Sequence, residues 1–359
     1  MKADKVALVL GARGLVGRAA MDHFAALDGW QSIGVARGRP HFPTKAAFLE
    51  ADLRDREATF RAFADLGHVT HVAYAALWEK PSLKESWTAS DQIATNAAML
   101  ENTLDALAAA GADVRHVSIV HGPKAYGVHM GPVPTPCREC DPWHLAPNFY
   151  YAQEEIIRQR RAGSRWSWTV LRPDFLCGVG VGGAMNLVGA IGVYAAICAE
   201  LGMPLRYPGT GVIRECTDVR LVARALAWAA ESDAAKDEVF NLTNGDVICF
   251  QDFWPRLERE FGLRASGRQR MSLAAWMPGR EADWDRIVEK HGLERRGYRD
   301  VSGSWELADA AFGNSLPHDW HVSTIKVRKA GFADCIDTEE MILGYIREMK
   351  DLNLIPQFT

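Results

Sequence analysis

Short apolar runs alternate with amphipathic helical patterns along the first half of the chain. Six runs rich in aliphatic residues are short enough to be buried strands, at residues 6–10, 32–36, 47–51, 71–75, 114–120 and 167–171. Helical periodicity lies between them, at residues 18–26, 56–66, 90–110 and 149–162. Parallel strands need crossover connections of this kind, so the pattern predicts a parallel sheet with helices on both faces.

The pattern changes after Arg172-Pro173. Apolar helical patterns cover residues 186–201, 219–230, 250–261 and 338–351, whereas residues 263–319 lack periodicity and are rich in Trp and Arg. The late Trp residues suit core packing or, as the alternative, an apolar pocket or lid. We predict that residues 1–175 form the sheet domain, completed by a strand near residues 212–245. Residues 176–359 should form a smaller, mainly helical region that binds or covers a substrate.

A glycine-rich turn joins the first predicted strand to the first helix. It reads Gly11-Ala12-Arg13-Gly14-Leu15-Val16-Gly17. Glycines at this spacing let the backbone turn tightly and approach a pyrophosphate, which the N–H groups at the helix start then face. Together with the alternating strands and helices, the turn predicts a Rossmann, doubly wound α/β domain that binds a dinucleotide through residues 11 and 13–17.

The end of the second strand favours NADP(H) over NAD. An NAD-binding domain usually carries an acid there to hold the ribose hydroxyls, whereas this strand ends Val35-Ala36-Arg37-Gly38-Arg39. A guanidinium attracts a 2′-phosphate, so we expect Arg37 and Arg13 to bind it. Asp52, after the third strand, fits either a contact with the adenine amino group or a simple turn. The remaining residues expected along the dinucleotide follow the third, fourth and sixth strands: Leu53, Ala75 and Pro173.

The segments that carry catalysis in short-chain dehydrogenases depart from the usual pattern. Extended members carry Ser-x-x-Val-Tyr-Gly after the fifth strand and Tyr-x-x-x-Lys on the next helix. This chain has His121-Gly-Pro-Lys124-Ala-Tyr126-Gly127 and Asn148-Phe-Tyr150-Tyr151-Ala-Gln-Glu154-Glu155 in these places. The Ser is therefore absent, a Lys stands in the loop, and Glu154 or Glu155 replaces the helix Lys.

These departures resemble one family, the progesterone 5β-reductase/iridoid synthase-like enone reductases. That family pairs a Lys in Gly-x-Lys-x-Tyr with the first Tyr of Asn-Phe-Tyr-Tyr, and both segments are present here. The resemblance continues through residues 185–198, 240–246 and 329–332, so it covers nearly the whole chain. It implies NADPH-dependent 1,4-reduction of an activated C=C bond. Tyr150, beside the nicotinamide end of the cofactor, would stabilise the enolate oxygen with help from Lys124, and Tyr151 is the alternative.

Residues on the expected substrate side differ from the family pattern. The family often has Thr-Trp just after the fourth strand, where this chain reads Ala76-Leu77-Trp78. The Gly of the family's Arg-Pro-Gly segment becomes Asp174. These differences concern the substrate more than the chemistry, and a hydrophobic carbonyl compound remains the expected substrate class. The residues expected to line its pocket are Leu77, Trp78, Met185 and Tyr151.

Two other functions remain open at this stage. The same cofactor and Tyr could reduce a ketone or aldehyde directly, as in a carbonyl reductase or alcohol dehydrogenase. The chain could also be a redox-silent NADP-binding sensor. Relatives of that second kind usually lose the catalytic Tyr, whereas this chain keeps Tyr and Lys together.

Composition narrows the partners and the compartment. The net charge of −4 gives no reason to expect nucleic acid or a membrane surface as a partner. The first residues do not read as a secretory signal, and no apolar stretch is long enough for a membrane helix. Cys137-x-x-Cys140 with His144 lacks a fourth zinc ligand, so we expect free thiols and no metal. We predict a cytoplasmic protein and, by analogy with superfamily relatives, consider a homodimer.

Overall fold

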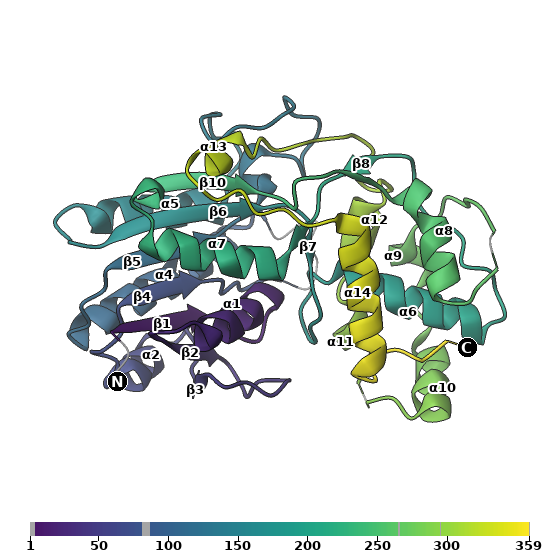
Figure 1. Cartoon of the computed structure of the whole chain (residues 1–359), viewed down its shortest axis with the longest axis horizontal. Helices are drawn as coiled ribbons and strands as arrows, with labels where there is room; N and C mark the ends of the chain where they lie inside the picture. The colour runs from purple at the N-terminus through teal and green to yellow at the C-terminus, as the bar shows by residue number, and fades with distance from the viewer. Residues whose placement is uncertain (1–3, 81–86, 265, 295, 359) are drawn as a thin grey trace.

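A seven-stranded parallel sheet forms the centre of the molecule, with helices on both faces (Figure 1). The computed structural model describes residues 4–80, 87–264, 266–294 and 296–358. The strands lie in the order β10-β6-β5-β4-β1-β2-β3. Their bounds are β1 Lys5–Leu10, β2 Trp30–Ala36, β3 Ala47–Glu50, β4 His71–Tyr74, β5 His116–Val120, β6 Ser167–Pro173 and β10 Glu238–Leu242. All six strands predicted in the first half are present, and the doubly wound parallel sheet is confirmed.

Burial on both faces explains why the strands are apolar throughout. Along β1, Ala7 and Val9 pack into one core cluster, whereas Val6, Leu8 and Leu10 pack into another on the opposite face. Two helices cover the first face: α1 (Leu15–Ala26) and α7 (Val219–Glu231). Three helices cover the second face: α2 (Arg56–Phe63), α4 (Ser90–Ala109) and α5 (Phe149–Arg161).

The edge strand β10 returns from the second half of the chain. It runs parallel to β6, with Glu238 opposite Thr169 and Leu242 opposite Pro173. It therefore lies within residues 212–245, where we expected a strand that completes the sheet. Two short pairs flank it: β8 (Ile213–Arg214) with β11 (Ile248–Cys249), and β9 (Thr217–Asp218) with β7 (Leu176–Cys177). Because β10 ties the second half to the first, the division at residue 175 stays a prediction.

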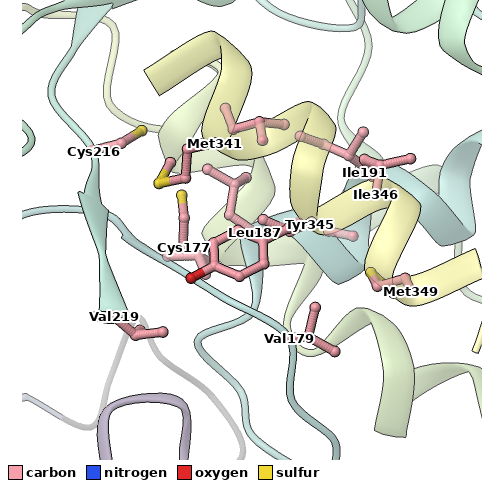
Figure 2. Close-up of a cluster of buried hydrophobic side chains, with 14 of the residues drawn as sticks. Cys177, Val179, Leu187, Ile191, Cys216, Val219, Met341, Tyr345, Ile346 and Met349 are labelled. Atoms are coloured by element: carbon pink, nitrogen blue, oxygen red, sulfur yellow. The ribbon is translucent and has the colours of Figure 1, made fainter. Parts of the chain in front are cut away.

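The second half is built on α6 (Leu187–Glu200), which is buried on almost every side. This burial explains why the helix is apolar all round. The C-terminal helix α14 (Thr338–Asp351) packs against it. Figure 2 shows Leu187 and Ile191 of α6 gathered with Tyr345 of α14 in one apolar cluster. Helix α8 (Phe250–Glu260) packs against α14, whereas the short α13 (Ile325–Lys329) packs against β10.

The prediction that residues 263–319 are irregular is wrong. They contain four short helices: α9 (Leu273–Trp276), α10 (Glu281–His291), α11 (Tyr298–Ser302) and α12 (Trp305–Ala311). Three of them pack on α6, with Trp284, Tyr298 and Trp305 buried. Helices of one to three turns, each anchored by one or two aromatic rings, are too short to reveal a period. The late Trp residues 254, 284, 305 and 320 are buried, which favours the packing interpretation.

Among the described helices, none combines the length and the apolarity that a membrane crossing requires.

Candidate active site

The turn after β1 needs its glycines for packing. Gly11 has φ +82°, and a Cβ on it would lie 2.6 Å from the carbonyl oxygen of Ala75. A Cβ on Gly17 would lie 2.1 Å from the carbonyl oxygen of Gly11. The backbone N–H groups of Gly11 and Ala12 donate to Val35 O at 3.0 and 3.1 Å, which fixes the turn on β2. Ala75 in turn donates to Leu10 O at 3.0 Å.

The N-terminus of α1 suits a phosphate group. Gly14 caps the helix without any side chain bonded to the first N–H groups. Leu15 and Val16 follow, partly buried and buried respectively, so the first turn is held by packing rather than by a polar cap. Free N–H groups at a helix start bind anions through their donors and the helix dipole. The glycine turn and the N-terminus of α1 therefore fit the pyrophosphate of a dinucleotide.

Arg13 extends from this turn to the end of β2. Its Nη1 atom lies 2.9 Å from the position that a Cβ on Gly38 would take, and its Nη2 atom contacts His41 Nε2. Its Nε is buried and has no partner among the described residues. Arg37 is exposed beside the same backbone. Arg13 and Arg37 thus both lie near the end of β2, and their binding of a 2′-phosphate stays a prediction.

Asp52 adopts the turn role. Its carboxylate accepts hydrogen bonds from Arg54 Nε at 3.0 Å and Arg54 Nη2 at 2.6 Å, and from the Arg54 backbone N–H at 3.1 Å. The hydrogen bond from the Arg54 side chain is the main cause that lowers the Asp52 pKa. Leu53 is buried beside it. Contact of Asp52 and Leu53 with an adenine ring stays a prediction.

Tyr150 and Lys124 meet at one indole ring. Lys124 belongs to a 3₁₀ turn at Pro123–Tyr126, and Tyr150 to the first turn of α5. The Lys124 Nζ atom lies 3.5 Å from the centroid of the Trp87 ring, and the Tyr150 ring meets Trp87 edge-on at 5.3 Å. Asn148 ties the two segments, since it caps Tyr150 N–H at 3.0 Å and donates to Lys124 O at 3.2 Å.

The two neighbouring tyrosines have different environments. The Tyr151 hydroxyl donates to Ala125 O at 2.8 Å and accepts from His144 N–H at 3.1 Å, while its ring stacks on Trp143 at 4.3 Å. The Tyr150 ring stacks on His121 at 4.2 Å, and among the described residues its hydroxyl has no hydrogen-bond partner. A Cβ on Gly122 would lie 3.4 Å from that hydroxyl and 3.3 Å from Pro173 O. Of the two tyrosine hydroxyls, that of Tyr150 is the one without a hydrogen-bond partner among the described residues.

Burial sets the protonation states around Trp87. Burial raises the pKa of Tyr150 far above neutrality, and the negative charge of Glu79 adds to this, so the phenol stays a neutral donor. Burial lowers the pKa of Lys124 to about 7, while the nearby Glu79 carboxylate opposes the shift. Burial in turn raises the pKa of Glu79. Lys124 thus titrates in the physiological range.

A family model and several known proteins match most of this chain. Residues 7–243 match the model of the NAD dependent epimerase/dehydratase family. The (S)-8-oxocitronellyl enol synthase of Antirrhinum majus is 31% identical, over 98% of this chain and 93% of its own length. The 3-oxo-Delta(4,5)-steroid 5-beta-reductase of Arabidopsis thaliana is 30% identical, over 98% of this chain and 94% of its own.

The chain belongs to the progesterone 5β-reductase/iridoid synthase-like family. It is thereby an oxidoreductase of the short-chain dehydrogenase type, within the wider epimerase/dehydratase family. Solved structures share the fold at low identity. A putative epimerase from Burkholderia cenocepacia J2315 has a TM-score of 0.68 at 21% identity, covering 98% of this chain and all of its own. The UDP-glucose 4-epimerase of Thermus thermophilus, solved with NAD, has a TM-score of 0.66 at 19% identity, covering 96% of this chain and 99% of its own.

This family member buries Glu154, not Glu155, at the helix position where other dehydrogenases carry Lys. Glu154 accepts a hydrogen bond from Arg172 Nη2 at 2.6 Å, with both side chains almost fully buried, whereas Glu155 is exposed. Burial alone would raise the Glu154 pKa. His121, whose Nδ1 lies 3.5 Å away, and the Arg172 charge outweigh burial and hold that pKa at about 2. The sequence did not distinguish which glutamate takes the place of the helix Lys. In the structure Glu154 is the buried one.

The residues predicted for the substrate pocket do not gather as a group. Tyr151 packs beside Tyr150 in the Trp87 cluster, which comprises Trp87, Ala125, Phe149, Tyr150 and Tyr151. Trp78 instead lies with Arg54 and the exposed side of α4, beside a pocket of about 390 Å³. Leu77 is 37% exposed and Met185 packs on the core of the second half. Their contact with a substrate stays a prediction.

The sequence did not point to Trp87, whose ring contacts both Lys124 and Tyr150. Trp87 lies thirteen residues beyond the end of β4, outside any family motif and outside the expected Thr-Trp position. Its burial at 4% exposure and its neighbour Glu79 became visible only in the fold. Of the two cysteines in the Cys-x-x-Cys pair, Cys137 is buried and Cys140 exposed, both as free thiols. No metal-binding group of three acidic, His or Cys side chains occurs in the described residues.

We expect Glu154→Gln to lower the free energy of unfolding by about 3–5 kcal/mol, because it leaves the buried Arg172 charge unpaired. Glu154→Gln combined with Arg172→Met should cost less than the single change. Denaturant unfolding measures all three proteins. The exposed Glu155→Gln is the control and should stay within about 0.5 kcal/mol of the parent. Equal losses for Glu154→Gln and Glu155→Gln would contradict the buried pair.

Proposed function

We propose that this chain catalyses the NADPH-dependent 1,4-reduction of the C=C bond of an enone or enal in a hydrophobic carbonyl compound. The main support is the Tyr150 hydroxyl, which is buried, neutral and without a hydrogen-bond partner among the described residues, while its ring contacts the same indole as the buried Lys124. The two relatives named above, an enol synthase and a steroid 5-beta-reductase, also support it.

In this proposal, the cofactor-binding residues hold successive parts of the dinucleotide. The turn with Gly11 and Gly14 would hold the pyrophosphate, and Arg13 with Arg37 the 2′-phosphate. A bound nicotinamide supplies hydride to the carbon β to the carbonyl group. Ala75 directly follows β4 and Pro173 is the last residue of β6, so both lie at the carboxyl ends of the strands, where dinucleotides lie in this fold.

Tyr150 acts where negative charge develops. As hydride reaches the β-carbon, the electron pair of the C=C bond moves and charge collects on the carbonyl oxygen as an enolate. A preorganised donor aimed at this oxygen contributes about 3 kcal/mol of barrier lowering. The burial that keeps the phenol protonated also strengthens its hydrogen bond, since local dielectric screening is low. The α-carbon then takes a proton, for which solvent is the proposed source.

Lys124 supports the phenol through its charge. An ammonium on the same indole ring as Tyr150 makes the neutral phenol a better donor and stabilises the negative charge that develops on the enolate. The Trp87 face holds that ammonium by a cation–π contact, so the ring is a positioning residue for both groups. The Tyr151 hydroxyl has a structural role instead, because it is hydrogen-bonded to two backbone groups.

Product analysis tests the reaction type. A panel of cyclic enones, enals, saturated ketones and aldehydes is incubated with NADPH, and products are identified by mass spectrometry and NMR. We expect saturated carbonyl products from the enones and enals. Allylic alcohols would instead show direct carbonyl reduction with the same Tyr. Tight NADPH binding with no turnover on any compound would favour the redox-silent sensor.

Replacing Tyr150 with Phe should lower kcat by about 10²–10³, because one oxyanion donor is lost. The Tyr150 hydroxyl has no described partner, so thermal stability and NADPH affinity should stay unchanged. Tyr151→Phe is the matched control: it should cost about 1–2 kcal/mol of stability and much less activity, since two hydrogen bonds are lost. Steady-state kinetics with thermal unfolding separate the two. An unchanged kcat for Tyr150→Phe would move the catalytic role elsewhere.

The rate should fall as pH rises through about 7, because Lys124 then loses its proton. The Glu79 carboxylate raises the Lys124 pKa, so Glu79→Gln should move this limb of the kcat profile to lower pH. The exposed Glu57→Gln serves as control and should leave the profile in place. A limb that stays at the same pH in Glu79→Gln would argue against this coupling.

A further inference from the structure

The connection between β2 and β3 brings a histidine to the guanidinium of Arg13. His41 Nε2 contacts Arg13 Nη2, and it lies 3.7 Å from the position that a Cβ on Gly182 would take. Since the guanidinium can only donate, the contact requires Nε2 to be an acceptor and the imidazole to be neutral. His41 thus belongs to the group of cations and potential cations at the end of β2, with Arg13 and Arg37.

The charges that face His41 come from both halves of the chain. Arg13 lies on the β1–α1 turn, while Arg296, Glu294 and Asp300 lie between α10 and the middle of α11. Burial is the largest cause that lowers the His41 pKa, followed by the charge of Arg13 and then that of Arg296. Asp300 and Glu294 oppose this shift. In the free protein, two neighbouring guanidinium groups therefore disfavour an imidazolium.

We propose that His41 is a ligand of the phosphate monoester held by Arg13 and takes up one proton when that group binds. The ligand would be the 2′-phosphate of NADPH, so the inference rests on the cofactor choice in the proposed function. A phosphate dianion among these groups reverses the electrostatics, because it attracts both the guanidinium and an imidazolium. His41 then changes from an acceptor for Arg13 to a second donor for the phosphate.

Proton uptake by His41 determines the direction in which NADPH affinity changes with pH. The pKa of His41 lies below 6.5 in the free protein and would rise in the complex. Between these two values binding consumes a proton, so NADPH affinity should fall as pH rises, by up to about tenfold per pH unit. The phosphate itself, with a pKa of about 6, acts in the opposite direction at lower pH. From pH 6.5 to 8.5 the phosphate is mostly ionised, and NADH, which lacks the 2′-phosphate, shows any contribution from other groups such as Lys124.

Isothermal titration calorimetry of the full chain tests this without any substrate. NADPH and NADH are titrated from pH 6.5 to 8.5, in two buffers of different ionisation enthalpy, so that bound protons are counted. For the parent protein we expect NADPH affinity to fall about tenfold across the range with net proton uptake, while NADH affinity stays flat. His41→Gln keeps a polar side chain but cannot titrate, so its NADPH affinity should be flat and weaker at pH 6.5.

The control variant is His68→Gln, which removes an exposed histidine bonded only to the backbone oxygen of Asp65. It should bind NADPH with the pH dependence of the parent. Tight NADPH binding with the same slope and proton count in His41→Gln and the parent would overturn the role of His41 and leave the proposed function standing. Equal parent affinities for NADPH and NADH would overturn both the inference and the choice of NADPH.

Discussion

The contact between a buried ammonium and one indole ring is the constraint on which the active-site geometry depends. Removing the Lys124 charge from water is costly, and the Trp87 face and the Glu79 carboxylate offset only part of that cost. The Lys124 amine therefore loses its proton near neutral pH, because its pKa is lowered to about 7. Because the same ring meets Tyr150 edge-on, a single side chain sets both the spacing of phenol and ammonium and the low polarity around them.

The charge arrangement is reversed relative to dehydrogenases that carry the lysine on the helix. Here the helix holds a buried carboxylate, Glu154, and the ammonium comes from the loop after β5. Both groups are linked to the Tyr150 ring, Glu154 through His121 and Lys124 through Trp87. Glu154 is neutralised by Arg172 and is close to His121, which stacks on the Tyr150 ring. A helix Lys in place of Glu154 would meet Arg172 and leave two buried cations without a counter-charge.

Sequence could predict the features that depend on local pattern. The strands buried on both faces and the glycine turn carry signals that short range alone determines. Lys124 and Tyr150 were singled out by the family resemblance, and their roles stay predictions. Trp87 and His41 carry no such signal, because each lies in a connection and acquires its role only when the fold brings another segment to it. The prediction of irregular structure for residues 263–319 was wrong for a related reason. Their helices are stabilised by contacts of a few aromatic rings with α6, and tertiary packing of that kind leaves no period in the sequence.

The proposed nucleotide site brings together segments from both halves of the chain. Around His41, Arg13 comes from the turn after β1, whereas Arg296 and Asp300 come from the second half. The backbone of Asp300 accepts a hydrogen bond from Gly182 N–H at 2.8 Å, in the segment that leads into α6. A ligand that binds only the assembled form stabilises that form. Nucleotide held at Arg13 would thus favour the packing of α11 and α6 against the sheet domain. It would thereby favour the surface that a hydrophobic substrate needs before hydride transfer begins.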